Sequence, residues 1–469
     1  MSDLSSPIPA RADVWASTIL LLVFGCSLAV LVQAGLAGNP ALVLVSGGAL
    51  AAALVVLASA DWLDPLAALP FVLPLPALAG TGTLRVTPAI LLTGVIVAAW
   101  LLRESRSRRL IPRGSIPVAP IATFLCAAFL SSIFARHHAS AVREFTNIAL
   151  LLGLLVAATA YAVERPLRVR SMVLTVSAVS AVSGLAAVLQ MFGLLAGEFP
   201  FNDTGWNRAT LGFGWPNELG TFFAVSIPVC GHACVAARRG LPRFLAATGM
   251  CVSVLGLIAT FSRGSWIALM AGSLILLLAG EHRFLIRIWT VAVVLLLMSD
   301  AILGGAILGR IADTAADPLV GQRAALMMVA LLVFRENPII GIGPGGFAES
   351  LDSFGPQVGW LFNYVGTAHN AYLDIAAEMG LIGLISFLVF IASVGRILLR
   401  GARRATAETG IALEERSIRR ALLWSFGTVC MVSFTVWPFA HGVGQLVMLI
   451  AALGIASEQS ESLPSNARQ

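Results

Sequence analysis

Long apolar runs separated by short polar turns recur along the chain from Val14 almost to Ala456. A bilayer core about 30 Å thick needs roughly 20 apolar residues per spanning helix, and runs of that length occur a dozen or more times. The pattern predicts an all-α polytopic membrane protein. Fourteen spans are expected near residues 14–36, 41–59, 62–80, 85–102, 117–134, 145–163, 171–195, 217–236, 244–261, 265–280, 288–309, 371–399, 421–437 and 441–457.

Two of these spans have an alternative interpretation. The proline-rich stretch 65–76 and the short last span are also compatible with re-entrant or interfacial segments, so the prediction is 12 to 14 transmembrane helices. No small-residue cleavage site accompanies the first span, which we therefore expect to be retained. The chain divides into N-terminal helices (1–309), a large loop with short helices (310–370), C-terminal helices (371–457) and a polar tail (458–469).

Arginine gathers in five of the connecting stretches, at 103–113, 165–170, 238–243, 283–287 and 400–420. Loops rich in basic residues stay on the cytoplasmic side of a membrane. We therefore expect both termini to lie in the cytoplasm. Four polar segments then lie on the outer side of the membrane, at 136–143, 197–215, 262–265 and 310–368.

Composition excludes several classes of protein. Hydrophobic residues make up 58% of the chain and charged residues 12%, which is unlike a soluble domain. The net charge of +6 is accounted for by arginines in short loops, so nucleic acid is not an expected partner. All six cysteines fall in apolar spans, which argues against a disulfide framework.

Three apparent motifs are rejected on physical grounds. Cys230 and Cys234 share a helix face from which His232 points away, so the three cannot bind one metal ion. The adjacent pair His137-His138 lacks a second ligand pair, and we expect no metal and no cofactor. A GxGxxG match within 341–346 contains Pro344, which has no amide donor, so a structural turn is favoured over a phosphate or sugar contact.

Outward-facing arginines are exceptions to the charge bias and need an explanation. They are Arg136, Arg143, Arg208, Arg263, Arg310, Arg323 and Arg335. Arg263 lies between small residues at a membrane boundary, where it could be an interface anchor, but a planar guanidinium with room around it favours a phosphate ligand. Arg208 and Arg323 are the next candidates. Arg310 and Arg335 are interpreted as structural.

His369 stands where the large outer segment is expected to become a helix. The helix dipole disfavours an imidazolium there, so a neutral imidazole can accept a proton. A helix-capping histidine is the alternative. Further along, Gly380 and Gly383 predict a close approach of a neighbouring helix, and a carboxylate at Asp374 or Glu378 could orient the histidine or pair with an arginine.

Four motifs together resemble the O-antigen ligase and polymerase superfamily, with the closest similarity to O-antigen ligases. They are Gly212-Phe213-Gly214-Trp215-Pro216-Asn217-Glu218, Ser262-Arg263-Gly264-Ser265-Trp266, Asn337-Pro338-Ile339-Ile340-Gly341-Ile342-Gly343-Pro344 and His369-Asn370. The ligases show His, then Asn, Ser or Gln, nine residues, Gly, two residues, and Gly, Thr or Tyr. Here His369-Asn370 is followed by Gly380 and Gly383 at that spacing.

The resemblance implies a GT-C-like, inverting glycosyltransferase of lipopolysaccharide biosynthesis that needs no cofactor. Such an enzyme would lie in the bacterial inner membrane with its active site facing the periplasm. Its donor would be an undecaprenyl-diphosphate-linked glycan, its acceptor lipid A core or another glycan, and membrane lipids would surround it. The implied base is His369. The implied diphosphate ligands are Arg263, Arg323 and Arg208, with Asn370, Ser262 and Asn217 in support.

Two alternatives to the ligase stay open. One is a polymerase of O-antigen, capsule or exopolysaccharide, of which protein O-glycosylation is a variant. The other is a transporter, which predicts charged residues or broken helices near the bilayer midplane. Asp300 is the main residue of that kind.

Overall fold

The computed structural model describes residues 65–76, 87–107, 116–164, 167–195, 207–237, 239–312, 318–359, 366–404, 411–439 and 442–459. The predicted spans 14–36 and 41–59 lie outside these residues. Every regular element in the described ranges is helical. The prediction of an all-helical chain is therefore confirmed for the part of the protein that the structure describes.

The first half of the described chain contains α3 (Pro65–Val72), α4 (Pro88–Ser107), α5 (Val118–Ile133), α6 (His138–Glu164), α7 (Leu167–Met191), η1 (Leu211–Phe213), α8 (Pro216–Ala236), α9 (Leu241–Ala259), α10 (Arg263–Ser273) and η2 (Leu274–Ala279). The second half contains α11 (His282–Ile302), α12 (Ala306–Ala312), α13 (Pro318–Glu336), α14 (Phe347–Phe354), η4 (Gly355–Val358), α15 (Ala371–Arg404), α16 (Ile411–Val432) and α17 (Val443–Gln459).

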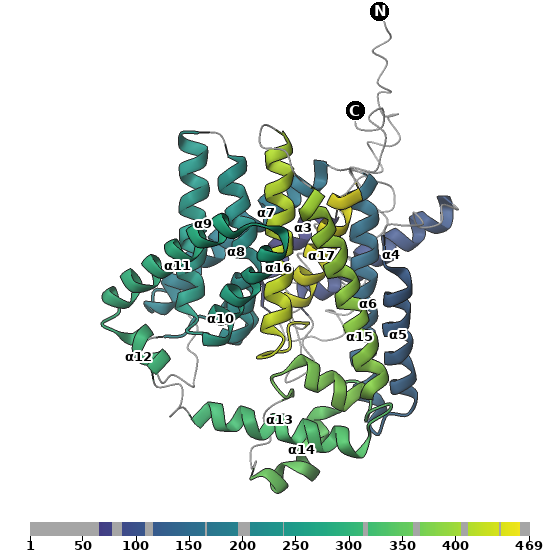
Figure 1. The fold of residues 1–469 in the computed structure, drawn as a ribbon. Coiled ribbons are helices and arrows are strands. Elements are labelled where there is room, and N and C mark those ends of the chain that lie inside the picture. Colours follow the sequence, from purple (N-terminus) through teal and green to yellow (C-terminus); the bar gives the residue numbers. More distant parts are fainter. Residues whose placement is uncertain are drawn as a thin grey trace, which may run out of the picture.

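The helices form one bundle in which α16 and α17 are central (Figure 1). Helix α16 packs against α8 and α10, and α17 packs against α6, α15 and α16. Helices α8 and α17 are apolar on all sides and almost wholly buried, as expected of helices surrounded by other helices. Helices α13 and α14 cross one end of the bundle.

Six described helices are long and apolar enough to cross a membrane: α4, α6, α7, α8, α9 and α15. Four shorter apolar helices occur at Val118–Ile133, Arg263–Ala279, Trp289–Ile302 and Val443–Gln459. The chain is thus a polytopic membrane protein, and the count of 12 to 14 spans stays a prediction. Helix α3 has eight residues, only about 12 Å of helix, so this helix does not by itself provide the span predicted at 62–80.

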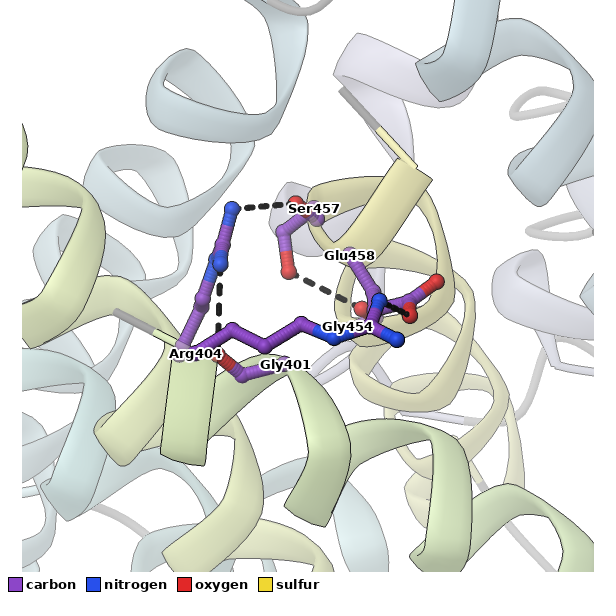
Figure 2. Close-up of polar contacts among 6 residues, drawn as sticks. Gly401, Arg404, Gly454, Ser457 and Glu458 are labelled. Atoms are coloured by element: carbon purple, nitrogen blue, oxygen red, sulfur yellow. Dashed lines mark hydrogen bonds and ion pairs between the residues drawn. The ribbon is translucent and has the colours of Figure 1, made fainter. Parts of the chain in front are cut away.

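The two ends of the bundle differ in chemistry. We call the end where α6, α8, α15 and α17 finish the arginine end. There Arg419, only 3% exposed, donates to the carbonyls of Gly401 (3.2 Å) and Ser457 (2.9 Å) at the last turns of α15 and α17. Figure 2 shows the neighbouring ion pair, in which Arg404 lies 2.7 Å from Glu458. A cation at helix carboxyl ends satisfies carbonyls that have no partner inside their own helix.

We call the opposite end, where α8, α10 and α15 begin and α13 and α14 lie, the loop end. Helices α13 and α14 have a small core of their own there. It consists of Leu326, Val329, Ala330, Val333, Ile342, Phe347, Leu351, Phe354, Ala368 and Ala377. This core joins the segment 318–359 to the first turns of α15 and so gives the loop end a defined shape.

Candidate active site

Three of the four sequence motifs stand at the start of a helix at the loop end. The first leads through η1 into α8, which Pro216 begins. Ser262 precedes α10, and Asn370 precedes α15. Motifs that are far apart in the sequence are therefore placed at one end of the bundle.

Backbone strain marks the same three motifs. Within the described ranges the non-glycine residues with positive φ are Leu211 (44°), Phe261 (50°) and His369 (54°). Each stands in or next to one motif. A left-handed conformation costs a residue with a side chain on the order of 1–3 kcal/mol and persists where the surroundings enforce it, typically at functional sites.

The first two motifs lie against each other. A Cβ on Gly220 would lie 2.8 Å from the Cβ of Ser262, so α8 and the α9–α10 turn are in close contact. The Ser262 hydroxyl donates to Asn217 Oδ1 at 3.0 Å. Arg208, 5% exposed, donates from Nε to the Thr260 carbonyl at 3.1 Å. Thus the structure brings the predicted residues Arg208, Asn217 and Ser262 together, next to Arg263.

A buried glutamine that sequence reasoning missed supports this region. Gln190, at the end of α7, is 2% exposed. Its Oε1 accepts hydrogen bonds from the amides of Thr210 (2.9 Å) and Leu211 (3.0 Å), so it holds the strained turn after Arg208. The sequence signal that could have identified Gln190 was a polar side chain inside an apolar span. Such side chains usually have a structural or functional role.

His369 lies directly before α15, and Asn370 caps that helix. Asn370 Oδ1 accepts hydrogen bonds from the amides of Tyr372 (3.1 Å) and Leu373 (3.2 Å), as side chains at the first helical boundary do. The predicted supporting residue is therefore a helix cap. The role of capping residue, considered for the histidine, belongs to its neighbour.

Electrostatically, His369 is coupled to Arg323. Burial, and secondly the positive charge of Arg323, lower the pKa of His369 to about 4. A neutral imidazole at pH 7 agrees with the prediction. Its causes are burial and an arginine, whereas the sequence argument invoked the helix dipole. Two predicted site residues are thus brought within electrostatic reach of each other.

The end of α16 connects the two halves of the site. Ser433 accepts a hydrogen bond from the amide of Ala371 at 2.8 Å, immediately after the His369 turn. Two residues on, Thr435 contacts the first turn of α10, since a Cβ on Gly264 would lie 2.8 Å from its Oγ1. Nothing in the sequence singled out this turn. One short segment therefore forms a common wall for the motifs of Arg263 and His369.

The glycine-rich motif pairs with a break in α15. Gly380 has φ 64° and ψ −163° within the helix. The amides of Ile342 and Gly343 donate to the carbonyls of Ala377 (3.3 Å) and Glu378 (2.9 Å). On the other side of the break, the amides of Leu381 and Ile382 donate to Pro338 and Ile339. The broken helix therefore exchanges its backbone hydrogen bonds with the motif instead of with itself.

This pairing corrects the expected role of Gly380. A Cβ there would lie 2.3 Å from the carbonyl of Ile339, so the close neighbour is the 338–343 segment and not another helix. A Cβ on Gly383 would meet Met379 of its own helix. The amides of Gly341, Gly343 and Gly346 all donate hydrogen bonds to carbonyls of the protein. The segment is therefore the structural turn that the sequence favoured over a phosphate contact.

Carboxylates of α15 take part in fixing the loops. Glu378 accepts a hydrogen bond from the amide of Phe347 (3.1 Å), and Asp374 accepts one from the amide of Ala368 (2.6 Å). Asp300 accepts the amides of Ile307 and Leu308, each at 2.9 Å, at the start of α12. The residue that most suggested transport is thus a helix cap.

The other residues considered from the sequence lie apart from this site. Arg136 donates to Asn337 at 3.4 Å, which fits a structural role, and Arg335 is exposed. The side chain of Arg310 lies outside the described residues. Cys230, His232 and Cys234 contact different neighbours, namely Ser253, Ser417 and Met250.

Comparison with known proteins bears on the same region. No curated protein matches the chain. One family model matches residues 248–388. The motifs of Arg263, Asn337 and His369 all fall within this segment, whereas the motif at 212–218 lies before it. Members of the matched family are membrane enzymes that transfer glycans. Residues 248–388 match the family model of the O-antigen ligases, and the resemblance indicated by the motifs is confirmed over that segment.

Proposed function

We propose that this protein transfers a preassembled glycan from undecaprenyl diphosphate to an acceptor hydroxyl at the periplasmic face of the bacterial inner membrane. Ligation of O-antigen to lipid A core is the favoured reaction, because the spacing from His369-Asn370 to Gly380 and Gly383 follows the ligase pattern. The observation that carries the proposal is the state of His369. Its backbone is held in a strained conformation, and burial and the charge of Arg323 keep its imidazole neutral. Both residues lie within the segment 248–388 that matches the family model.

Charge supports the proposed orientation. Arginines such as Arg168, Arg403 and Arg416 lie at the arginine end, which we assign to the cytoplasm. The loop end then faces the periplasm, where a lipid-linked glycan is presented. Helix α17 finishes at the arginine end, which agrees with a cytoplasmic C-terminus.

In the proposed reaction His369 takes the proton of the acceptor hydroxyl. The acceptor oxygen forms a bond to the anomeric carbon, the bond from that carbon to the phosphate oxygen breaks, and the diphosphate leaves with the electron pair. Attack from the face opposite the leaving group inverts the anomeric centre. Arg263, Arg323 and Arg208 stabilise the charge of the departing diphosphate.

The electrostatic coupling suggests how the donor prepares the base. In the free protein, the charge of Arg323 disfavours an imidazolium at His369. A diphosphate bound to Arg323 offsets that charge, so His369 accepts a proton more readily once the donor is in place. His369 therefore takes the proton of the acceptor hydroxyl mainly when donor and acceptor are both bound.

The test is complementation of a ligase-deficient strain at matched membrane levels. Wild type should restore glycan on lipid A core, and His369→Ala should reduce the transfer rate by roughly 10² to 10⁴. His137→Ala is the matched control, because His137 is an exposed histidine at the same end and should retain wild-type transfer. Rescue of a polymerase-deficient strain, without ligation in either background, would replace the ligase assignment with a polymerase.

A further inference from the structure

The turn that carries His369 needs an external support. Its φ of 54° lies in the region that side chains avoid, at a cost on the order of 1–3 kcal/mol. The local hydrogen bond from its own amide to Thr367 Oγ1 is long, at 3.3 Å. Other contacts must therefore keep the imidazole in its observed direction.

Asp374 supplies the shortest of these contacts. It lies one turn into α15, is 2% exposed, and accepts the Ala368 amide hydrogen at 2.6 Å through Oδ1. This bond closes a loop that runs from the Ala368 amide to the Asp374 side chain and contains His369 and Asn370.

Helix capping does not explain Asp374. Asn370 already accepts the amides of Tyr372 and Leu373, and Ala371 donates to the carbonyl of Ser433. Helix α15 thus starts without a contribution from Asp374. The aspartate acts one step earlier, on the residue before the histidine.

The surroundings of Asp374 are costly for a carboxylate. Its Oδ2 is buried without a hydrogen-bond partner among the described residues, and the carboxyl group of Glu144 acts on it electrostatically. Burying such a group costs several kcal/mol by order of magnitude. A residue that only stabilised the fold would be better replaced by an apolar one, so a specific task is indicated.

Contact with the imidazole is not needed for that task. The influences on His369 are burial and Arg323, from α13, without a carboxylate among them. Asp374 therefore reaches the histidine through the backbone of Ala368. The same arrangement occurs at Gln190, whose side chain holds the backbone of the strained turn at Leu211.

We propose that Asp374 is the positioning residue of the transfer site, because it fixes the left-handed turn of His369 and with it the direction in which the imidazole meets the acceptor hydroxyl. This inference rests on the proposed function of His369. Misplacement of a reacting group by about 1 Å can lower a rate by roughly 10²-fold, which is the scale on which a positioning residue acts.

The test compares Asp374→Ala and Asp374→Asn in purified protein supplied with lipid-linked glycan and acceptor. Asp374→Ala should lower kcat by about 10- to 100-fold with KM for the donor unchanged within about twofold, because donor binding belongs to the arginines. Asp374→Asn keeps an acceptor oxygen and should retain kcat within about threefold. Glu349→Gln, which alters another carboxyl at the loop end, is the matched control and should keep both constants.

Three outcomes would overturn the inference. Wild-type kcat in Asp374→Ala would remove the positioning role. An equal loss in Asp374→Asn would show that the charge is needed and not the hydrogen-bond acceptor. A raised KM with unchanged kcat would assign Asp374 to donor binding.

A double variant separates positioning from a folding defect and from failure of the proposed function. If Asp374 acts through His369, then Asp374→Ala causes no further loss of the residual rate in the His369→Ala background. A folding defect would lower that residual rate by the same factor as in wild type and contradict the inference. Wild-type activity of His369→Ala alone would instead contradict the proposed function, whatever the Asp374 variants do.

Discussion

Left-handed backbone is used differently at the two ends of the bundle. At the arginine end the turns before α9 and α11 place Gly240 (φ 92°) and Gly280 (φ 81°) in this conformation, which glycine adopts without a steric penalty. At the loop end glycines such as Gly214 and Gly341 adopt it too, but so do Leu211, Phe261 and His369. Among the described residues, only the loop end retains side chains at positions where glycine would be easier to accommodate.

The contacts of arginine side chains also differ between the two ends. Arg416 lies 2.9 Å from Glu281 at the arginine end and fixes α16 to the turn before α11. Arg323 at the loop end instead acts on His369, where it opposes a second positive charge. Substitutions at the arginine end should therefore change stability, and substitutions at the loop end should change transfer.

The largest expected effect is on transfer at the loop end. Arg263→Ala should lower the transfer rate by about 10²- to 10³-fold, because a cationic donor to the departing diphosphate is lost. Thermal unfolding should change little. Arg404→Ala is the control at the arginine end, where removal of the half-exposed ion pair with Glu458 should leave transfer intact and cost less than about 1 kcal/mol. Equal loss of transfer in both variants would erase the distinction between the ends.

The next effect is on stability at the arginine end. Arg419→Met removes the donor to the buried carbonyls of Gly401 and Ser457 and should lower the free energy of unfolding by about 2–3 kcal/mol. Transfer per folded molecule should stay at the wild-type level. Denaturation in detergent, followed alongside the transfer rate, measures both quantities. Loss of transfer without loss of stability would contradict the structural role.

Substitutions to and from glycine at left-handed positions test how backbone strain contributes to stability and to transfer. Phe261→Gly relieves about 1–3 kcal/mol of backbone strain but removes a phenyl ring that is 1% exposed, a loss on the order of 3–5 kcal/mol. Stability should therefore fall by about 1–3 kcal/mol, and transfer should fall a few fold because Ser262 and Arg263 are held less firmly. Gly280→Ala introduces such strain and should lower stability by about 1–2 kcal/mol without changing transfer. A gain in stability in Phe261→Gly would show that the backbone strain outweighs the packing of the buried phenyl ring.

The smallest effect concerns pH. Removing the charge in Arg323→Gln raises the pKa of His369 from about 4 toward its ordinary value, although burial, the larger cause, still opposes the imidazolium. A larger fraction of the base is then protonated in mild acid, so the ratio of the rates at pH 5 and pH 7.5 should fall roughly twofold relative to wild type. An unchanged ratio would show that Arg323 does not act on the base.

Parts of the site were accessible from the sequence because they rest on local rules. The outward arginines were exceptions to the charge bias, and His369 followed from its place before an apolar helix. Gln190 and Ser433 were not found, because their task depends on contacts with Leu211 and Ala371. The side-chain oxygen of Gln190 and the backbone carbonyl of Ser433 both accept amide hydrogens from segments distant in the sequence, and such hydrogen bonds leave no periodic signal.

By itself the sequence determined the class of protein, the run of helices, the difference in charge between the ends and the four motifs, because hydropathy and charge act through windows of neighbouring residues. Only the tertiary structure decided which motif meets which. The break at Gly380 exists because residues 338–343 lie within hydrogen-bonding distance. The turn of His369 is held by an aspartate one helical turn away, and such closure depends on how the chain packs in three dimensions.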